Sequence, residues 1–312
     1  MKGLTSKKLT MATLTATLTL ATLTTHAATY YVSPAGNDDG GTTWEKAFTQ
    51  IQTAVAKTDA TEIIVTNGTY AAISRTDNAA LTIRSVNGAK YTIIDGGNTN
   101  RCATLGSATT HTATVLTGFT LTNGNASHAN VAVQRNYGGG AYGGTLNNCI
   151  LTGNSAYRGA GTSASTLNNC MITGNTASNA GGGVAGGTLN NCTVVGNKAG
   201  TSSSSGGGVY NSGRRDNCII WGNFLSDGTT TNNYYLGDFR NSCSTFPTLA
   251  NGNINSTRFS WTPRTAIFGC TPIRRALTRG AFLIQTASLT STATRAFRAA
   301  RWTWARMNPW RP

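Results

Sequence analysis

A nine-residue unit recurs four times in the middle of the chain. Three copies begin with Leu-Asn-Asn-Cys and end with Gly-Asn, and they start at Leu146, Leu167 and Leu189. A fourth, degenerate copy runs from Asp216 to Asn223. The cysteines of successive copies are 21, 22 and 26 residues apart. This period is typical of one coil of a solenoid, so the repeat restricts the fold to a stack of similar coils.

Each copy contains a short apolar, β-type run that Gly-Asn closes. Clusters of three glycines add a second break, at residues 138–140, 181–183 and 206–208. Helices do not fit between such breaks, because glycine and asparagine are poor helix formers, whereas short strands do. One unit of this length would hold about three short strands and three bends. The sequence therefore predicts an all-β fold, a parallel β-helix.

Stacked coils place equivalent residues above one another, about 4.8 Å apart. The repeat cysteines should then form one interior column of free thiols that act as small buried hydrophobes. The second asparagine of each Asn-Asn pair would form a neighbouring column. The asparagine of each Gly-Asn pair is expected in a left-handed bend, and its column is interpreted as a structural ladder rather than a polar binding stripe. The three columns are Cys149, Cys170, Cys192 and Cys218; Asn148, Asn169, Asn191 and Asn217; and Asn154, Asn175, Asn197 and Asn223.

A short amphipathic helix is expected to cover the N-terminal end of the stack. Thr42 and Glu45 have the spacing of a capping box, and apolar residues recur at helical intervals from Trp44 to Val55. Solenoids need such a cap because an open end exposes core residues and strand edges. Trp44 and Phe48 are interpreted as packing residues of this cap rather than as a sugar-stacking pair.

The net charge of +15 arises at the two ends of the chain. Lys2, Lys7 and Lys8 lie at the start, and ten arginines without any lysine or acid follow Thr257. Between these ends the chain has 12 basic and 10 acidic residues, and the bases are not clustered. This pattern argues against nucleic-acid binding by the central part.

Three segments follow from these patterns. Residues 1–28 are interpreted as a secretory signal peptide, with basic residues, a run rich in Leu, Ala and Thr, and a small-residue cleavage site. Residues 29–255 form the β-helix domain, which we expect to be monomeric. Residues 256–312 form an arginine-rich tail, irregular or disordered and outside the fold. No segment after the signal has the apolar length to span a membrane.

Several motifs of this chain resemble a known superfold. They are Tyr-Tyr-Val-Ser-Pro-Ala-Gly-Asn-Asp at 30–38, Thr-Trp at 43–44, Ile-Gln-Thr-Ala-Val at 51–55, Asn-Gly-Thr-Tyr at 67–70 and Ile-Ile-Asp-Gly-Gly at 93–97. They resemble the opening of secreted right-handed parallel β-helix proteins with the pectin-lyase-like fold. The Gly-Gly-Gly-Ala and Thr-Gly-Asn-Ser-Ala elements are similar to repeats of polymorphic outer-membrane proteins and adhesins. The resemblance implies a right-handed β-helix at the cell surface or outside the cell, but no single activity, because this fold hosts many.

The tail is consistent with a shifted reading frame. Proteins of this kind often continue with Asp-Pro-Leu-Phe-Val-Asp-Ala-Ala-Asn-Gly-Asp and end near Asp-Met-Gly-Ala-Tyr-Glu-Pro. With suitable codons, reading each segment one base later gives Thr-Arg-Phe-Ser-Trp-Thr-Pro-Arg-Thr-Ala-Ile and Thr-Trp-Ala-Arg-Met-Asn-Pro. These are residues 257–267 and 303–309. We hypothesise a frameshift near Asn255, which resequencing of the genomic DNA tests.

Catalytic chemistry finds little support in the sequence. A pectate-lyase-like site needs several carboxylates to hold Ca²⁺, but no Asp or Glu lies between Cys102 and Arg215. Asp216 and Asp238 are the candidate pair for a hydrolase, which needs two carboxylates close together. The histidines, His26, His111 and His128, lack partners for a zinc site. No catalytic residue, metal ligand or cofactor is therefore assigned, and Ca²⁺ enters only with the lyase alternative.

Arginines and tyrosines in the variable parts of the coils are the candidates for ligand binding. On a flat β-face they would stack on sugars and bind their hydroxyls; otherwise they are ordinary loop residues. They are Arg135, Tyr137, Tyr142, Tyr157, Arg158 and Tyr210. The leading interpretation is a non-catalytic exported module that binds polysaccharide or another extracellular partner. The alternatives are a polysaccharide lyase or hydrolase acting on acidic glycans, and a purely structural adhesin.

Overall fold

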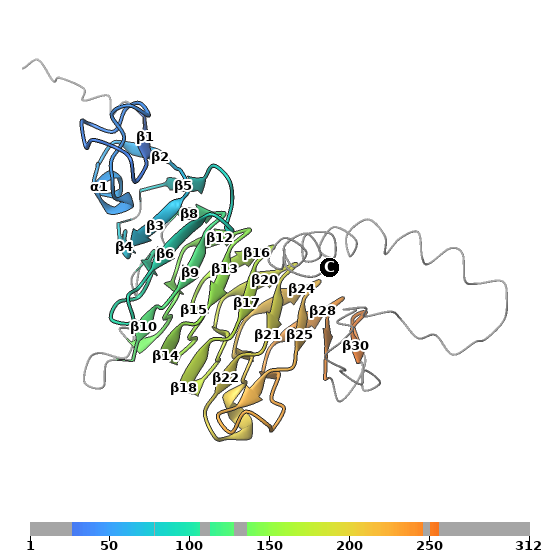
Figure 1. Ribbon diagram of the computed structural model, residues 1–312. Coiled ribbons are helices and arrows are strands. Elements are labelled where there is room, and N and C mark those ends of the chain that lie inside the picture. Colours follow the sequence, from blue (N-terminus) through green and yellow to red (C-terminus); the bar gives the residue numbers. More distant parts are fainter. Residues whose placement is uncertain (1–26, 78, 107–112, 128–135, 246–249, 256–312) are drawn as a thin grey trace, which may run out of the picture.

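The chain winds into a right-handed parallel β-helix, seen in a computed structural model that describes residues 27–77, 79–106, 113–127, 136–245 and 250–255. Successive coils lie side by side along one axis, from the N-terminal end to the last strands (Figure 1). Every pairing between the named strands is parallel, and equivalent strands of successive coils build four sheets, here S1 to S4. Each regular coil passes through S1, S2, S3 and S4 in turn, so it has four strands and four bends instead of the three predicted.

Sheets S1 and S2 are the longest, with nine strands each among the described residues. S1 consists of β1 (Ala28–Val32), β2 (Ala60–Val65), β5 (Leu81–Ser85), β8 (Thr114–Thr117), β12 (Thr145–Asn147), β16 (Thr166–Asn168), β20 (Thr188–Asn190), β24 (Arg214–Asp216) and β28 (Asp238–Arg240). S2 consists of β3 (Gly68–Ala71), β6 (Thr92–Asp95), β9 (Thr120–Thr122), β13 (Ile150–Thr152), β17 (Met171–Thr173), β21 (Thr193–Val195), β25 (Ile219–Trp221), β29 (Cys243–Ser244) and β30 (Ile254–Asn255).

Sheets S3 and S4 are built from shorter strands. S3 consists of β10 (Asn125–Ala126), β14 (Ser155–Arg158), β18 (Thr176–Ala180), β22 (Lys198–Ala199) and β26 (Phe224–Leu225). S4 consists of β4 (Ile73–Ser74), β7 (Ala103–Thr104), β11 (Ala141–Tyr142), β15 (Thr162–Ser163), β19 (Val184–Ala185), β23 (Val209–Tyr210) and β27 (Tyr234–Tyr235). A 3₁₀ turn, η2 (Ser203–Ser205), precedes β23. S3 has no strand in the coils of β3 and β6.

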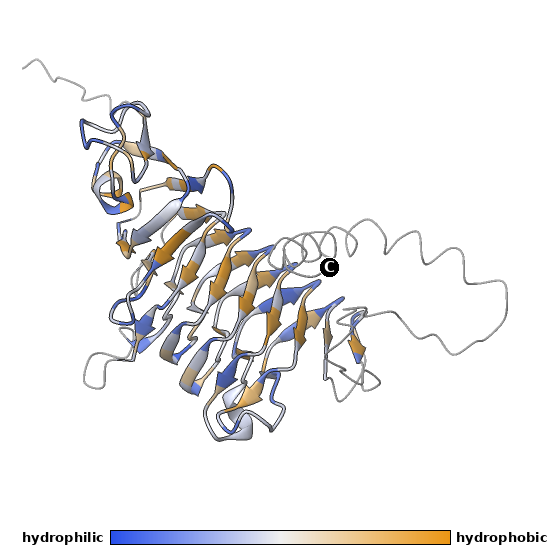
Figure 2. Ribbon diagram, in the orientation of Figure 1, coloured by the Kyte–Doolittle hydropathy of each residue, from blue (hydrophilic) through white to orange (hydrophobic). Residues whose placement is uncertain are grey.

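The interior is a continuous apolar core lined by one residue in two from each strand. Leu146, Leu167 and Leu189 from S1 are fully buried, as are Leu151 and Ile172 from S2. The strands consequently alternate between apolar and polar residues, as the hydropathy colouring shows (Figure 2). One coil cannot bury its own inner face, so stacking supplies the burial that stabilises the fold.

The cysteine column is confirmed. Cys149, Cys170, Cys192 and Cys218 are buried free thiols at one position per coil. Each Sγ donates to the carbonyl of the S1 leucine or its equivalent in the preceding coil, for example Cys170 to Leu146 at 3.3 Å. Burial raises the pKa of the Cys170 and Cys218 thiols well above the ordinary value, and the neighbouring sulfurs raise it further. The Cys170 and Cys218 thiols are therefore protonated at neutral pH.

The asparagine of each Gly-Asn pair forms the expected ladder, but inside the core. Asn175 Nδ2 donates to Asn197 Oδ1 at 2.9 Å and to the Leu151 carbonyl at 2.9 Å, and Asn175 Oδ1 accepts from Asn154 Nδ2 at 2.9 Å. The same pattern runs down to Asn233. A second ladder on the S1 surface joins Asn147, Asn168 and Asn190 at 2.8 and 2.9 Å. These amides satisfy one another and the backbone, so the structural interpretation holds.

The predicted left-handed bend was assigned to the wrong residue. Asn148, Asn169, Asn191 and Asn217 have φ between 53° and 55° and make the bend from S1 to S2. At the bend from S2 to S3 the glycine of Gly-Asn is left-handed, as in Gly153 (φ 66°), and leaves the asparagine free to turn inward. Asparagine tolerates this conformation because its side chain is short, and glycine adopts it without strain.

The N-terminal cap exists but is shorter than predicted. The helix α1 spans Ile51–Val55, begins after Gln50 without a side-chain cap, and does not use the Thr42–Glu45 capping box. The preceding segment instead folds back on β1, where Phe48 forms a bridge with Val32. The Gln52 amide accepts from Ser74 N at 2.7 Å and donates to Ser74 O at 3.3 Å. It therefore pairs with the first strand of S4 as another strand would.

Two of the predicted segments fall outside the described residues. The structure does not describe residues 1–26 of the predicted signal peptide or the tail from residue 256. The signal peptide, the irregular tail and the frameshift therefore stay predictions. Ala28 of β1 already pairs with Ala60 of β2, one residue before the predicted start of the domain at residue 29. Within the described residues, no helix is long and apolar enough to cross a membrane.

Candidate binding face

The outer surface of S4 carries aromatic residues in one row. Strand register aligns Thr104, Tyr142, Ser163, Ala185, Tyr210 and Tyr235 in successive coils. Their chain neighbours Val184 and Val209 point into the core, so the row lies on the opposite side, since side chains alternate along a strand. Ser163 and Ala185 are small and buried, so no large side chain protrudes from the face between Tyr142 and Tyr210.

Arg158, at the corner between S3 and S4, contacts three tyrosines. The Arg158 guanidinium lies 5.3 Å from the ring centre of Tyr210, 5.7 Å from that of Tyr157 and 5.8 Å from that of Tyr137. These distances are within the range of cation–π attraction. Arg158 Nε donates to Asn179 Oδ1 at 2.7 Å, which fixes the plane of the guanidinium. The two terminal nitrogens have no hydrogen bond within the described residues, so they remain available to a ligand.

The tyrosine row continues beyond Arg158. Tyr210 stacks on Tyr235 of the next coil with ring centres 5.8 Å apart and planes inclined by 13°. Parallel, in-register strands produce this stacking because they hold equivalent side chains one strand spacing apart. The result is an aromatic platform next to a cation, half-exposed on one face of the solenoid.

A second arginine lies at the other end of the row. Arg101 stacks over Tyr142 with its guanidinium 5.1 Å from the ring centre. Its nitrogens donate to the carbonyls of Tyr137 and Gly138 and, at 3.0 Å, to Thr104 Oγ1. Burial lowers the pKa of Arg101 to about 10, and it stays charged at neutral pH. Arg101 thus holds the strand entering β11 against β7.

The structure unites most of the residues predicted for ligand binding. Tyr137, Tyr157, Arg158 and Tyr210 form one cluster, whereas Tyr142 pairs with Arg101. Arg135 lies outside the described residues. Arg101, Asn179 and Tyr235 were missed. Tyr235 was recognisable as the copy of Tyr210 in the next coil, and Asn179 as the residue one 21-residue period after Arg158.

The other candidate pairs are not assembled as ligand sites. Trp44 is 40% exposed and lies edge-on to Tyr31, while Phe48 is buried in the core, so they do not form a sugar-stacking pair. Asp216 and Asp238 lie on adjacent strands of S1, but register places Arg214 beside Asp238 and Arg240 beside Asp216. Each carboxylate forms an ion pair with an arginine of its own strand, Asp216 with Arg214 at 2.6 Å and Asp238 with Arg240 at 3.2 Å.

Metal ligands are also sparse in what the structure describes. No group of three His, Cys, Asp or Glu side chains that could hold a metal ion occurs among the described residues. All three histidines lie outside them. The lyase alternative therefore has no carboxylate cluster in the described coils to which Ca²⁺ would bind.

Comparison with known proteins gives structural matches only. No family model and no curated protein matches this chain. Matching solved structures include a pectin methylesterase mutant bound to a hexasaccharide, at 16% identity and a TM-score of 0.40, over 74% of this chain and 81% of that chain. A pectin methylesterase from Erwinia chrysanthemi matches at 16% and 0.38 with the same coverage. A pectate lyase matches at 14% and 0.34, over 70% of this chain and 63% of that chain. Scores this low transfer neither activity nor substrate to this chain.

Proposed function

We propose that this chain is a non-catalytic, exported or cell-surface module that binds polysaccharide on the outer face of S4. The observation that carries the proposal is the Arg158 cluster, in which one guanidinium lies within 6 Å of the ring centres of Tyr137, Tyr157 and Tyr210. Aromatic rings offer rigid apolar faces that stack on the C–H faces of sugars. The terminal nitrogens of Arg158 would donate to sugar hydroxyl or carboxylate oxygens.

The charge around this face favours a ligand that is neutral or acidic. Arg158 takes part in no ion pair among the described residues, and no acid occurs between Cys102 and Arg215. A carboxylate on the ligand would therefore meet a preformed cation in Arg158. Neutral glycans would use the tyrosine platform and the hydroxyl-binding nitrogens alone.

Binding to a panel of neutral and uronate polysaccharides tests the proposal by calorimetry or affinity electrophoresis. Tyr210→Ala and Arg158→Gln should each weaken binding by at least about tenfold, the equivalent of about 1.4 kcal/mol. Tyr91→Ala is the matched control, because Tyr91 is 42% exposed and precedes β6 in S2, outside the Arg158 cluster. Equal losses in all three variants, or no binding to any glycan, would overturn the proposal.

The same panel separates binding from catalysis. Incubation with uronate polymers and Ca²⁺ is followed by absorbance of unsaturated product and by the release of reducing ends. We expect no turnover. Turnover that is lost in Asp216→Asn or Asp238→Asn would replace the non-catalytic assignment with an enzyme. Binding to cells without binding to any glycan would favour the adhesin.

A further inference from the structure

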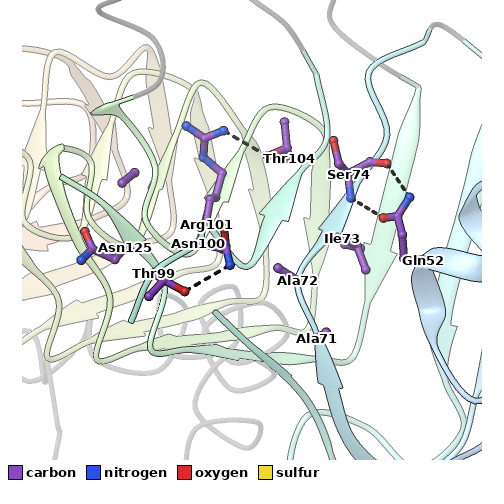
Figure 3. A pocket seen from close by; sticks show the side chains of 11 residues that line it. Gln52, Ala71, Ala72, Ile73, Ser74, Thr99, Asn100, Arg101, Thr104 and Asn125 are labelled. Carbon is purple, nitrogen blue, oxygen red and sulfur yellow. Dashed lines mark hydrogen bonds between the residues drawn. The ribbon is translucent and has the colours of Figure 1, made fainter. Parts of the chain in front are cut away.

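A cleft of about 770 Å³ opens at the N-terminal end of the same face (Figure 3). Polar groups from four parts of the chain line it: Gln52 of α1, Ser74 of β4, Asn100 and Arg101 before β7, Thr104 of β7 and Asn125 of β10. Alanines supply small side chains between them, among them Ala72, which lies near the centre of the view in Figure 3. The cleft has the amides and hydroxyls that suit a ligand rich in hydroxyl groups.

The cleft exists because two coils lack S3. S3 begins at β10, so the coils of β3 and β6 pass from S2 to S4 without a third strand. In the coil of β6 the chain uses a loop instead, in which Asn100 Nδ2 donates to Thr99 Oγ1 at 3.2 Å. The missing strands leave room above Ala126, which is itself buried at the edge of S3.

The cleft is continuous with the tyrosine row. Ser74 and Thr104, which line it, are aligned in S4 with each other and with Tyr142. Arg101 connects the two features, since it donates to Thr104 Oγ1 and stacks on Tyr142. A chain molecule lying along S4 over Tyr210 and Tyr142 would therefore enter the cleft.

The helix α1 borders the far side of the cleft. S4 starts at β4, and α1 packs against this strand. The Gln52 amide forms hydrogen bonds with both the N–H and the carbonyl of Ser74, as Figure 3 shows. A polymer that runs along the tyrosine row has no continuation of S4 beyond this point.

We propose that the cleft is a binding site for the terminal unit of a polysaccharide, whose following units lie along S4. This inference rests on the proposed function, and it means that the protein binds the ends of polysaccharide chains. Thr104, Asn100 and Asn125 supply hydrogen-bonding groups for the hydroxyls that are free only on a terminal unit. Internal segments of a long polymer are not expected to bind there, because no strand of S4 among the described residues continues beyond β4, and α1 borders that edge instead.

The test compares equal masses of one polymer that the protein binds, either intact or partly hydrolysed. If the protein binds chain ends, the amount bound is proportional to the number of ends. The moles of protein bound per gram of polymer then rise as the chains are cut. A protein that binds internal segments shows no such rise. A circular glycan, which has no end, should bind at least about tenfold more weakly than a linear one of the same units.

Two variants fill the cleft without touching the tyrosines. Ala72→Trp and Asn100→Trp should abolish the dependence on chain ends and weaken binding by about tenfold, while residual binding persists on the row. Asn87→Trp is the matched control, since Asn87 is an exposed loop residue between β5 and β6 that does not line the cleft. Its binding should equal that of the unmodified protein.

The outcomes distinguish the two proposals. If the unmodified protein binds no polysaccharide, the proposed function itself fails. If it binds in proportion to mass and the cleft-filling variants behave like Asn87→Trp, only the chain-end inference is overturned. Loss of the end dependence in both cleft variants but not in the control supports it, provided that circular dichroism shows the same folded spectrum for all.

Discussion

The regular coils and the last coils of this solenoid have different interiors. In the coils of β12, β16 and β20 the S1 strand turns a leucine inward, and a cysteine follows after the bend. In the coil of β24 the leucine is replaced by Arg215, which is fully buried. In the final coil Ser242 stands where the cysteine column would continue, and Ser244 replaces the inward aliphatic residue of S2.

Arg215 is accommodated by special contacts. Its Nε donates to Ser212 Oγ, Nη2 donates to the Leu236 carbonyl at 2.8 Å, and the guanidinium lies 4.3 Å from the ring centre of Phe239. Gly237 leaves room for it, because a Cβ there would overlap the guanidinium. Yet Nη1 and the hydroxyl of Ser244 have no partner within the described residues.

The difference shows which features carry the stability. The regular coils bury apolar side chains and pair every amide of the inner ladder, whereas the last coils bury a cation and unpaired polar atoms. Burial of an unpaired polar group costs about 1–3 kcal/mol. The C-terminal end should therefore be the part of the stack that opens first, and hydrogen exchange measures this directly.

The largest expected effect on stability comes from placing a buried arginine, as in the coil of β24, into a regular coil. Leu167→Arg places a cation between the buried Leu146 and Leu189. It should cost at least about 5 kcal/mol, since it removes a core side chain and buries an unpaired charge. Chemical denaturation measures the loss, and failure to fold is the extreme of the same result. Thr166→Arg, the outward neighbour, should change stability by less than about 0.5 kcal/mol. Equal effects would contradict the assigned faces.

The inner ladder gives the next largest effect. Asn175→Ala leaves the backbone N–H of Asn154 and the Leu151 carbonyl without their partners. We expect a loss of about 2–4 kcal/mol in the free energy of unfolding. Asn169→Gly is the control, because Asn169 is exposed, has φ 55°, and glycine adopts this conformation readily. A larger loss in the control than in Asn175→Ala would reverse the roles given to the two asparagines.

The repeat was sufficient to predict the coil, the thiol column and the ladder. These features depend on one residue per coil, and stacking converts a sequence period directly into spatial neighbours. The left-handed bend was misplaced because asparagine suits both a bend and a ladder, and the repeat alone does not say which of Asn148 and Asn154 turns inward. The capping-box pattern failed because Phe48 pairs with Val32 on β1, and this tertiary contact replaces the expected first turns.

The candidate site was only partly predictable for a similar reason. Tyrosines and arginines in the coils were recognised as a group, but their pairing depends on the corner between S3 and S4. Arg158 reaches Tyr210 two coils further on, and sequence distance gives no measure of that reach. The short strands of S3 were missed because small residues such as Ala156 and Ala177 make contacts there without any apolar run.

The smallest expected effect tests the last coils themselves. Burial lowers the pKa of Arg215 to about 10, so the unfolded chain holds this proton more tightly than the folded one. The charged arginine therefore destabilises the fold at pH 7, and the penalty fades only as the pH rises above the folded pKa. Arg215→Leu restores the leucine column and should stabilise the protein by about 1–3 kcal/mol.

Gly237→Ala completes the comparison as a double-mutant cycle. In the unmodified protein the added Cβ meets the Arg215 guanidinium, and φ at Gly237 is 130°, so the substitution combines a clash with backbone strain. In the Arg215→Leu background the backbone strain remains, but the added Cβ meets a smaller side chain. The loss in the free energy of unfolding caused by Gly237→Ala should therefore be about 1 kcal/mol smaller there than in the unmodified protein. Denaturation of the four proteins measures this coupling. Additive effects would show that Gly237 serves the bend alone, and that the end coils tolerate the buried cation without it.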